Sequence, residues 1–301
     1  MNDMSRTILR ILAVAFIAAD SIGTFIPGAP VWLVWLGEVA APILLFCMAW
    51  SMDKEKEPKK YLLYLYLCSA GMAVLNLIFS IPAAFPGVST AVTTNLFATL
   101  FASAYLIWLY EYQRQHPGKR RKVWLIYGAW QLGGAALWCV LSEIVGVPTN
   151  ILQFVFTICG NMFLAEGSAL LVGLGLIFYL TKENKKVLRF AYCMLFFIYF
   201  LNASTGIFGR VLSLLGSDVI LVVTELMTGL SMYGTWATAS FSFDHLMFHD
   251  YQWMMIAALP VLYFCNETAE RPRRGKRQNY WILAFYPAAA YVLWFFGNYI
   301  V

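Results

Sequence analysis

The sequence predicts an all-α fold, a polytopic integral membrane bundle of about nine or ten transmembrane helices that forms one membrane domain over residues 1–301. Hydrophobic residues make up 61% of the chain and charged residues only 12%, whereas soluble domains are roughly 45–50% apolar. Long apolar runs alternate with short basic stretches throughout. The polar stretches reach only about ten residues, fewer than the roughly 40 that independent folding needs, so we expect no soluble domain.

Positive charge is concentrated in four short stretches between apolar runs, which hold eighteen of the twenty-one Lys and Arg residues. Cytoplasmic loops of membrane proteins are enriched in such residues, so these stretches predict the inward-facing loops. The net charge of +5 therefore reports topology, and no nucleic-acid partner is expected. The four groups are Lys54, Lys56, Lys59, Lys60; Arg114, Lys119, Arg120, Arg121, Lys122; Lys182, Lys185, Lys186, Arg189; and Arg271, Arg273, Arg274, Lys276, Arg277.

Ten apolar segments follow one another along the chain, and a transmembrane helix needs about 20 residues. The first has Arg6 and Arg10 at its start and no clean cleavage site behind it, so it predicts a first span that enters from the inside. The sixth segment is long enough to be broken near Gly160 or Gly167. The segments are 7–26, 31–51, 60–81, 91–112, 122–145, 150–181, 187–207, 217–241, 251–265 and 279–300.

The number of apolar segments between the basic stretches conflicts with all four stretches facing inward. Two segments lie between the first and second basic stretches and two between the second and third, but three lie between Arg189 and Arg271. Either the last basic stretch faces outward or one segment fails to cross. The short 251–265 segment with Pro260 and the 206–216 stretch with Arg210 are the candidates for a re-entrant or interfacial piece. We expect nine crossings plus one such element.

The residues that most often bind metals give no metal site. All six cysteines lie in apolar segments without CxxC spacing, which predicts free thiols and no disulfide or zinc site. His245 and His249 have the i, i+4 spacing that places two imidazoles on one helix face, but no third ligand or HExxH core accompanies them. We interpret this pair as a polar interfacial stretch and expect no metal.

Ionisable groups within apolar segments are the strongest sequence signal for function, because each costs roughly 2.5–3.5 kcal/mol to insert. Two interpretations stay open. In the first, Arg210 pairs with Glu225 or Asp218 as a structural lock. In the second, acidic residues from different helices line one polar cavity. The residues concerned are Asp20, Glu38, Glu166, Arg210 and Glu225, with Asn95 and Asn161 as neutral polar company.

Short motifs in a fixed order run through most of the chain. They are Asp20 with Ile22-Gly23, Gly37, Ala40 to Pro42, Lys59-Lys60-Tyr61, Asn95-Leu96-Phe97 with Thr99, Glu166-Gly167, Leu176 to Leu180, Tyr251-Gln252-Trp253, Ala258-Leu259-Pro260, Asn266, Gly275-Lys276 and Phe285-Tyr286-Pro287. In this order and spacing the chain resembles the TraX family, membrane proteins typified by the acetylase of the conjugative F-pilin amino terminus. That family is similar to the acyltransferase-3 class.

The resemblance implies a bacterial cytoplasmic (inner) membrane protein, multi-pass, that moves an acyl group from acetyl-CoA or another acyl-CoA to a protein amino terminus or other envelope acceptor. It also implies the residues of the site. The acyl-acceptor end would comprise Asp20, Ser21, Glu38, Asn95 and Glu166. The coenzyme A phosphates would bind Arg271, Arg273, Arg274, Lys276 and Arg277, unless these residues serve topology alone.

The chain departs from the family pattern at its histidines. Ser21 follows Asp20 where the family usually has His, and Ala289 replaces a second His. Acyl transfer needs a base for the acceptor proton, so Asp20 or Glu166 would have to take that role. Three functions therefore remain open: an acyltransferase, either active with a carboxylate as its base or with its activity lost because those histidines are absent; a non-catalytic membrane protein that binds lipid, a small solute or a conjugation or secretion partner; and a small-solute transporter.

Overall fold

The computed structural model describes residues 6–54, 57–81, 92–216, 218–233, 241–263 and 281–299. Every regular element in these ranges is helical, which confirms the all-α fold class. The α-helices are α1 (Arg6–Phe25), α2 (Trp32–Glu38), α3 (Ala40–Lys54), α4 (Pro58–Phe79), α5 (Leu96–Gln115), α6 (Arg120–Cys139), α7 (Thr149–Ile158), α8 (Ser168–Thr181), α9 (Lys185–Thr205), α10 (Ile207–Ser213), α11 (Asp218–Thr228), α12 (Leu259–Tyr263) and α13 (Trp281–Tyr299). Short 3-10 or π-helical pieces lie between some of them at η1 (Pro117–Lys119), η2 (Val140–Ile144), η3 (Met162–Leu164), η5 (His245–His249) and η6 (Gln252–Ala258).

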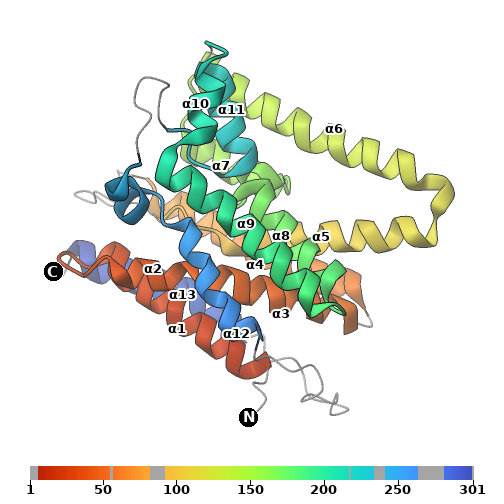
Figure 1. Ribbon diagram of the computed structural model, residues 1–301, viewed down its shortest axis with the longest axis horizontal. Coiled ribbons are helices and arrows are strands. Elements are labelled where there is room, and N and C mark those ends of the chain that lie inside the picture. The colour runs from red at the N-terminus through yellow and green to blue at the C-terminus, as the bar shows by residue number, and fades with distance from the viewer. Residues whose placement is uncertain are drawn as a thin grey trace.

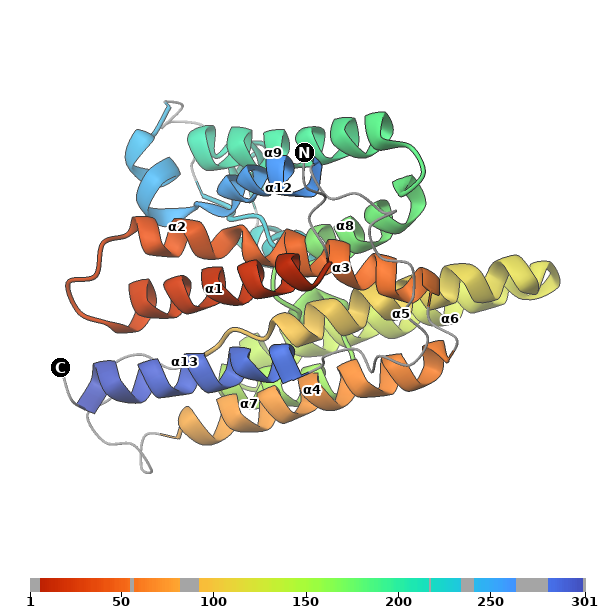
Figure 2. The ribbon, with the colours of Figure 1, turned by 90° about the horizontal axis from the view of Figure 1, so that it is seen from below.

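The helices pack side by side into an elongated bundle (Figures 1 and 2). Helix α1 packs on α2, α3 and α13, while α5 packs on α4, α3 and α8. The α6 helix lies at the edge of the bundle (Figure 1) and contacts the α7–η3 region through one face, which includes Tyr127 and Gln131. Most of its surface is consequently exposed, including Leu125, Ile126 and Trp130.

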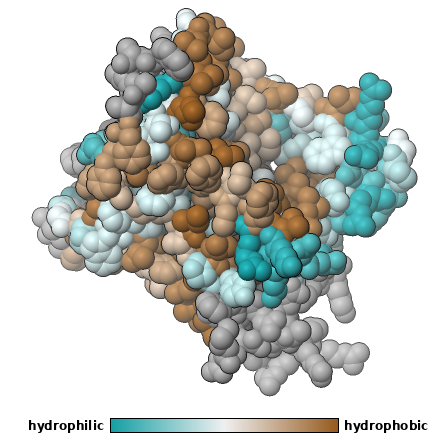
Figure 3. Space-filling view, viewed as in Figure 1, coloured by the Kyte–Doolittle hydropathy of each residue, from teal (hydrophilic) through white to brown (hydrophobic). Residues whose placement is uncertain are grey.

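Five helical stretches are long and apolar enough to cross a membrane, namely Ile8–Phe25, Trp32–Met52, Pro58–Phe79, Pro117–Ile144 and Lys185–Thr205. Their outward faces carry many large apolar side chains, which water would not favour. Figure 3 shows apolar surface over the body of the bundle and hydrophilic surface gathered at one end, over the α5–α6 and α8–α9 connections. These features indicate a membrane-associated protein.

The predicted break in the sixth segment is confirmed. Helix α7 ends at Ile158 and α8 begins at Ser168, and both Gly160 and Gly167 have positive φ, at 68° and 70°. This left-handed conformation costs glycine little, whereas it strains residues with a Cβ. In the second segment α2 ends at Glu38 and α3 begins at Ala40, and Val39 between them keeps right-handed helical backbone, so the two helices follow each other almost continuously.

Side chains satisfy the backbone groups that the α7–α8 break leaves free. The Gln131 amide donates to the Gly160 carbonyl (3.2 Å) and accepts from the Met162 N–H (2.8 Å). The Asn161 amide donates to the Gln131 carbonyl (3.1 Å) and accepts from the Phe163 N–H (2.9 Å). Non-helical backbone is tolerated at membrane depth only with such partners.

The prediction of one long helix at 217–241 is wrong. Helix α11 ends at Thr228, and the chain continues in a non-helical path from Gly229 to Tyr233. The reason is a close approach of two backbones: a Cβ on Gly229 would lie 2.8 Å from the Gly167 carbonyl carbon, and Gly229 has a φ of 72°. Residues 234–240 lie outside the described residues.

The end of α12 lies beside the start of α9, which bears on the conflict between the number of segments and the basic stretches. The Arg189 guanidinium lies 4.9 Å from the Tyr263 ring centroid. The chain therefore runs along α9 away from the end of the bundle that holds Arg189, and it returns to that same end along η6 and α12. Helices α10 and α11 lie across the top of the bundle as a pair in Figure 1. This arrangement favours the alternative in which one segment fails to cross; the number of crossings stays a prediction.

Candidate functional site

Acidic residues lie at helix ends or between helices in this bundle. Glu38 is the last residue of α2, Glu166 lies between η3 and α8, and Asp250 lies between η5 and η6. Asp20 is on α1, which packs along α2. We call these four residues the carboxylate cluster. Interrupted helices direct free backbone groups as well as side chains into a bundle, and ligand sites of membrane proteins often use them.

Glu38 links the four carboxylates. It is within electrostatic range of Asp20, Glu166 and Asp250, and Glu166 is also within range of Asp20. Among the described residues, no Lys, Arg or His forms an ion pair with any of the four. Carboxylates inside a protein are costly unless they are paired or protonated.

Gly37 determines where the Asp20 side chain lies. A Cβ on Gly37 would approach the Asp20 Oδ1 to 2.6 Å, closer than any ordinary contact. The absence of a side chain at Gly37 therefore makes the room in which the Asp20 carboxyl packs against α2, one residue before Glu38.

Glu166 is positioned through α5. The Thr99 hydroxyl donates to the Glu166 backbone carbonyl at 2.8 Å, and Thr99 is fully buried. The Asn95 backbone N–H is directed at the Glu166 carboxyl group. The N-terminal end of α5, with its free N–H groups, thus faces the cluster.

Two predicted site residues use their side chains for structure. The Asn95 Oδ1 accepts from the Ala98 N–H (3.2 Å) as the cap of α5, and its Nδ2 donates to the Ser69 carbonyl (3.0 Å). The Ser21 hydroxyl is buried and donates to the Ile17 carbonyl of its own helix (2.9 Å). The backbone of Asn95, rather than its amide, therefore contacts the cluster.

Asp250 and three tyrosines are part of the site that the sequence did not reveal. Tyr199 interacts electrostatically with Asp250 and Glu38, Tyr251 with Glu38 and Asp20, and Tyr286 with Glu166. One Asp250 oxygen is buried with no hydrogen-bond partner. Tyr251 and Tyr286 belong to the short motifs described above, and those motifs were the sequence signal for them. No sequence signal pointed to Asp250 or Tyr199, because only the fold brings these two residues to the cluster.

The histidine pair lies beside this region. The His245 ring stacks on the Tyr233 ring with centroids 3.4 Å apart, and the His245 and His249 centroids are 5.4 Å apart. His249 Nε2 lies 3.4 Å from the Asp244 carboxylate. Partial burial, followed by the nearby His249, lowers the pKa of His245. In the part of the chain that the structure describes, no three His, Cys, Asp or Glu residues are grouped to hold a metal.

A second candidate region is a cavity of about 840 Å³ at the end of the bundle where the α3–α4, α5–α6 and α8–α9 connections meet, which we call the basic end. Lys59 and Lys60 line one wall. On the α5 wall, the Trp108, Tyr112 and His116 rings stack in sequence, with centroids 5.6 Å and 4.4 Å apart. Cationic groups and stacked aromatic faces suit phosphates and planar rings.

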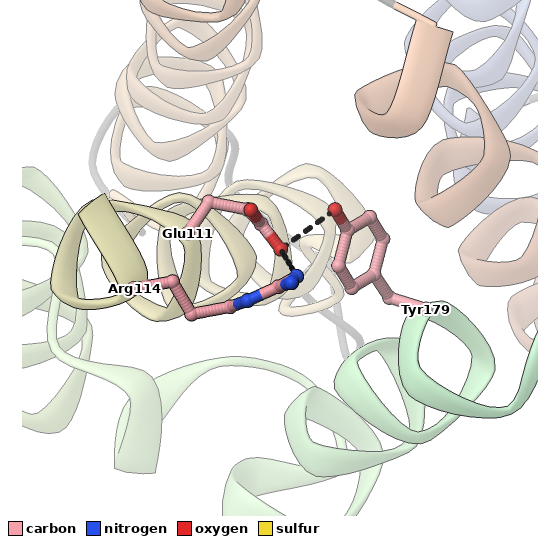
Figure 4. Close-up of polar contacts among 3 residues, drawn as sticks. All are labelled: Glu111, Arg114 and Tyr179. Atoms are coloured by element: carbon pink, nitrogen blue, oxygen red, sulfur yellow. Dashed lines mark hydrogen bonds and ion pairs between the residues drawn. The ribbon is translucent and has the colours of Figure 1, made fainter.

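Polar contacts join α5 and α8 at this cavity. The Glu111 carboxylate accepts from the Tyr179 hydroxyl at 3.0 Å and from the Arg114 guanidinium at 3.1 Å (Figure 4). The Lys182 Nζ lies 4.3 Å from the Tyr179 ring centroid. These contacts hold the end of α8 against the cavity. The predicted donor-binding residues Arg271, Arg273, Arg274, Lys276 and Arg277 lie outside the described residues.

Comparisons with known proteins place the chain in no family: no family model, no curated protein and no solved structure matches it.

Proposed function

We propose that this protein is a membrane acyltransferase that moves an acyl group from acyl-CoA to a primary amine, in the manner of the TraX proteins that it resembles. The observation that supports this proposal is the convergence of Asp20, Glu38, Glu166 and Asp250 without a basic partner among the described residues. An ammonium group supplies the missing positive charge and three N–H donors for carboxylate oxygens.

The chemistry requires one carboxylate to act as a base. Asp20 takes a proton from the bound ammonium, and the neutral amine nitrogen attacks the thioester carbonyl carbon. The C–N bond forms, the C–S bond breaks, and the leaving thiolate takes the second amine proton. Glu166, oriented by the Asn95 N–H, places the acceptor. Such proton transfer contributes typically 10²–10⁴-fold to the rate of an enzyme.

The donor would bind at the basic end. Lys59 and Lys60 neutralise its phosphates, and the aromatic wall of α5 stacks on its base. From Asn95 to Glu111 α5 rises by roughly 24 Å, at 1.5 Å per residue. A donor held at the basic end must therefore be long and flexible, as acyl-CoA is. In the proposed orientation, the basic end faces the cytoplasm of a bacterial cell. The acyl acceptor belongs to the cell envelope.

The donor site is tested by thermal unfolding of the detergent-purified protein with acetyl-CoA. A ligand at 100 times its dissociation constant adds about 2.7 kcal/mol to the folded state, so the unfolding temperature should rise. Lys59→Gln and Lys60→Gln should reduce the rise, whereas Lys122→Gln, exposed on α6 outside the cavity, should not. Adenosine alone is the ligand control. No rise at millimolar acetyl-CoA contradicts the proposal.

A second candidate is a non-catalytic binder or transporter of an organic cation. The break between α7 and α8 beside Glu166 favours it, since transporters bind their substrates at such breaks. Binding of a simple amine in the absence of any transfer from acetyl-CoA would support this second function.

A further inference from the structure

A pocket lined by basic and apolar side chains lies at the basic end, between α3, the α8–α9 connection, α9 and α12. We call it the lysine–arginine pocket. In Figure 2, α12 lies along α9, with α3 beneath them. None of its described lining residues also lines the cavity of about 840 Å³. They are Phe46 and Trp50 of α3, Lys182 after α8, Lys185, Leu188 and Arg189 of α9, and Leu259, Leu262 and Tyr263 of α12.

Aromatic rings and the backbone orient two of the three cationic side chains. The Lys182 Nζ lies 4.3 Å from the Tyr179 ring centroid, and the Arg189 guanidinium lies 4.9 Å from the Tyr263 ring centroid. The Arg189 Nε donates to the Lys185 backbone carbonyl at 3.1 Å. The two terminal guanidinium nitrogens of Arg189 can therefore donate to a ligand.

Two of the cations lie on the face of α9 that packs into the bundle. Lys185 and Arg189 are four residues apart, on the same helix face as the buried Leu188 and Tyr192. Lys186 lies off this face, is exposed, and is not among the lining residues. Positive charge marks an inward-facing helix end whichever way the side chains point. Topology alone therefore does not explain why Lys185 and Arg189 face a pocket.

No acidic side chain balances this charge in the part of the chain that the structure describes. The described lining residues include neither Asp nor Glu, and neither Lys185 nor Arg189 forms an ion pair there. Glu183, in the α8–α9 connection, is exposed and lies outside the lining. The pocket therefore presents an excess of positive charge to an anion.

The depth and the size of the pocket indicate which anion it fits. Lys185 is the first residue of the apolar span Lys185–Thr205, and Trp50 lies near the end of the span Trp32–Met52. The ends of spans lie at the level of lipid head groups, and basic pockets between helices bind such head groups. The pocket has a volume of about 20 Å³, which holds one oxygen-sized group and excludes a whole nucleotide.

We infer that the lysine–arginine pocket binds the phosphate of an anionic phospholipid. One phosphoryl oxygen enters the pocket, and Lys182, Lys185 and Arg189 surround the phosphate with charge-assisted hydrogen bonds. The acyl chains lie along the apolar outer surface of the bundle (Figure 3). Since the walls come from α3, α9 and α12, the bound lipid holds these helices together. The inference does not depend on acyl transfer.

Equilibrium binding of radiolabelled phosphatidylglycerol to the protein in a neutral detergent tests this inference. Arg189→Gln should raise the dissociation constant roughly tenfold or more, the usual contribution of a hydrogen bond to a charged group. Lys185→Gln should change it in the same direction, and it provides the test if Arg189→Gln does not fold. Lys186→Gln is the matched control, because it removes the same charge from the same helical turn but outside the pocket. It should leave binding unchanged.

Competing ligands identify the source of the phosphate. Phosphatidylcholine should compete roughly tenfold more weakly than phosphatidylglycerol, because its head group is neutral overall and basic residues favour anionic lipid. Inorganic phosphate, which has no acyl chains, should not displace the lipid at millimolar concentration. Displacement by inorganic phosphate overturns the assignment to a lipid. Equal binding by Lys185→Gln, Arg189→Gln and Lys186→Gln overturns the site, because the positive charge then acts without regard to position.

Discussion

At the scale of single residues, the position of the Asp20 carboxyl depends on a glycine one helix away. Gly37→Ala places a methyl group 2.6 Å from the Asp20 Oδ1 and must displace the carboxyl. A misplacement of about 1 Å costs on the order of 100-fold in rate. We expect that loss of transfer activity with unchanged helicity by circular dichroism. Gly133→Ala, with open space around its Cβ, should keep full activity; equal activity of both variants contradicts the role of Gly37.

The support of Glu166 by Thr99 gives a second residue-scale prediction. Thr99→Val keeps the shape of this buried side chain but removes the hydrogen bond to the Glu166 carbonyl. A buried acceptor left without its donor costs about 1–3 kcal/mol. We expect lower stability in urea by that amount and weaker amine binding. Thr224→Val, which removes a hydroxyl bonded only within the exposed face of α11, should leave both unchanged.

Sequence reasoning found part of this site. Asp20, Glu38 and Glu166 stand out because charge inside an apolar segment is rare, and the structure brings them together. Asp250 does not stand out, because it follows His249 in a polar stretch. The close packing of Gly37 on Asp20 also could not be predicted, since it depends on how α1 and α2 turn toward each other.

At the scale of helices, the break between α7 and α8 depends on Gln131 of α6. Gln131→Leu removes a donor to Gly160 and an acceptor for the Met162 N–H. We expect a loss of about 2–4 kcal/mol in the free energy of unfolding, from two buried backbone groups that lose their partners. Unfolding in mixed micelles measures it. Gln115→Leu at the exposed end of α5 is the control and should change stability little; an equal loss there contradicts this account.

Three glycines show which helix ends could be predicted from the sequence and which could not. Gly160 and Gly167 inside one over-long segment predict its break, and both adopt the expected left-handed conformation. Gly229 has the same conformation but lies in the middle of the 217–241 segment, which has an ordinary length and whose apolar composition alone favours a continuous helix. The helix end is determined by the contact between the Gly229 and Gly167 backbones, which no local pattern contains.

At the scale of the whole molecule, the basic end should face the cytoplasm. A cysteine placed at His116, in the α5–α6 connection, should resist a membrane-impermeant maleimide in intact cells and react after lysis. A cysteine at Ala29, between α1 and α2, should react in intact cells. Both are compared with the wild-type background from native thiols such as the exposed Cys159. Labelling of the His116 position in intact cells contradicts the orientation.

The central claim is that the carboxylate cluster holds an amine and deprotonates it for acyl transfer. Its most direct test is single-turnover transfer of radiolabelled acetyl from acetyl-CoA to a primary amine in detergent-purified protein. We expect transfer by the wild type and by Asp244→Asn, which changes an exposed carboxylate outside the cluster, and no detectable transfer by folded Asp20→Asn. Undiminished transfer by Asp20→Asn would contradict the account, as would the absence of transfer by the wild type.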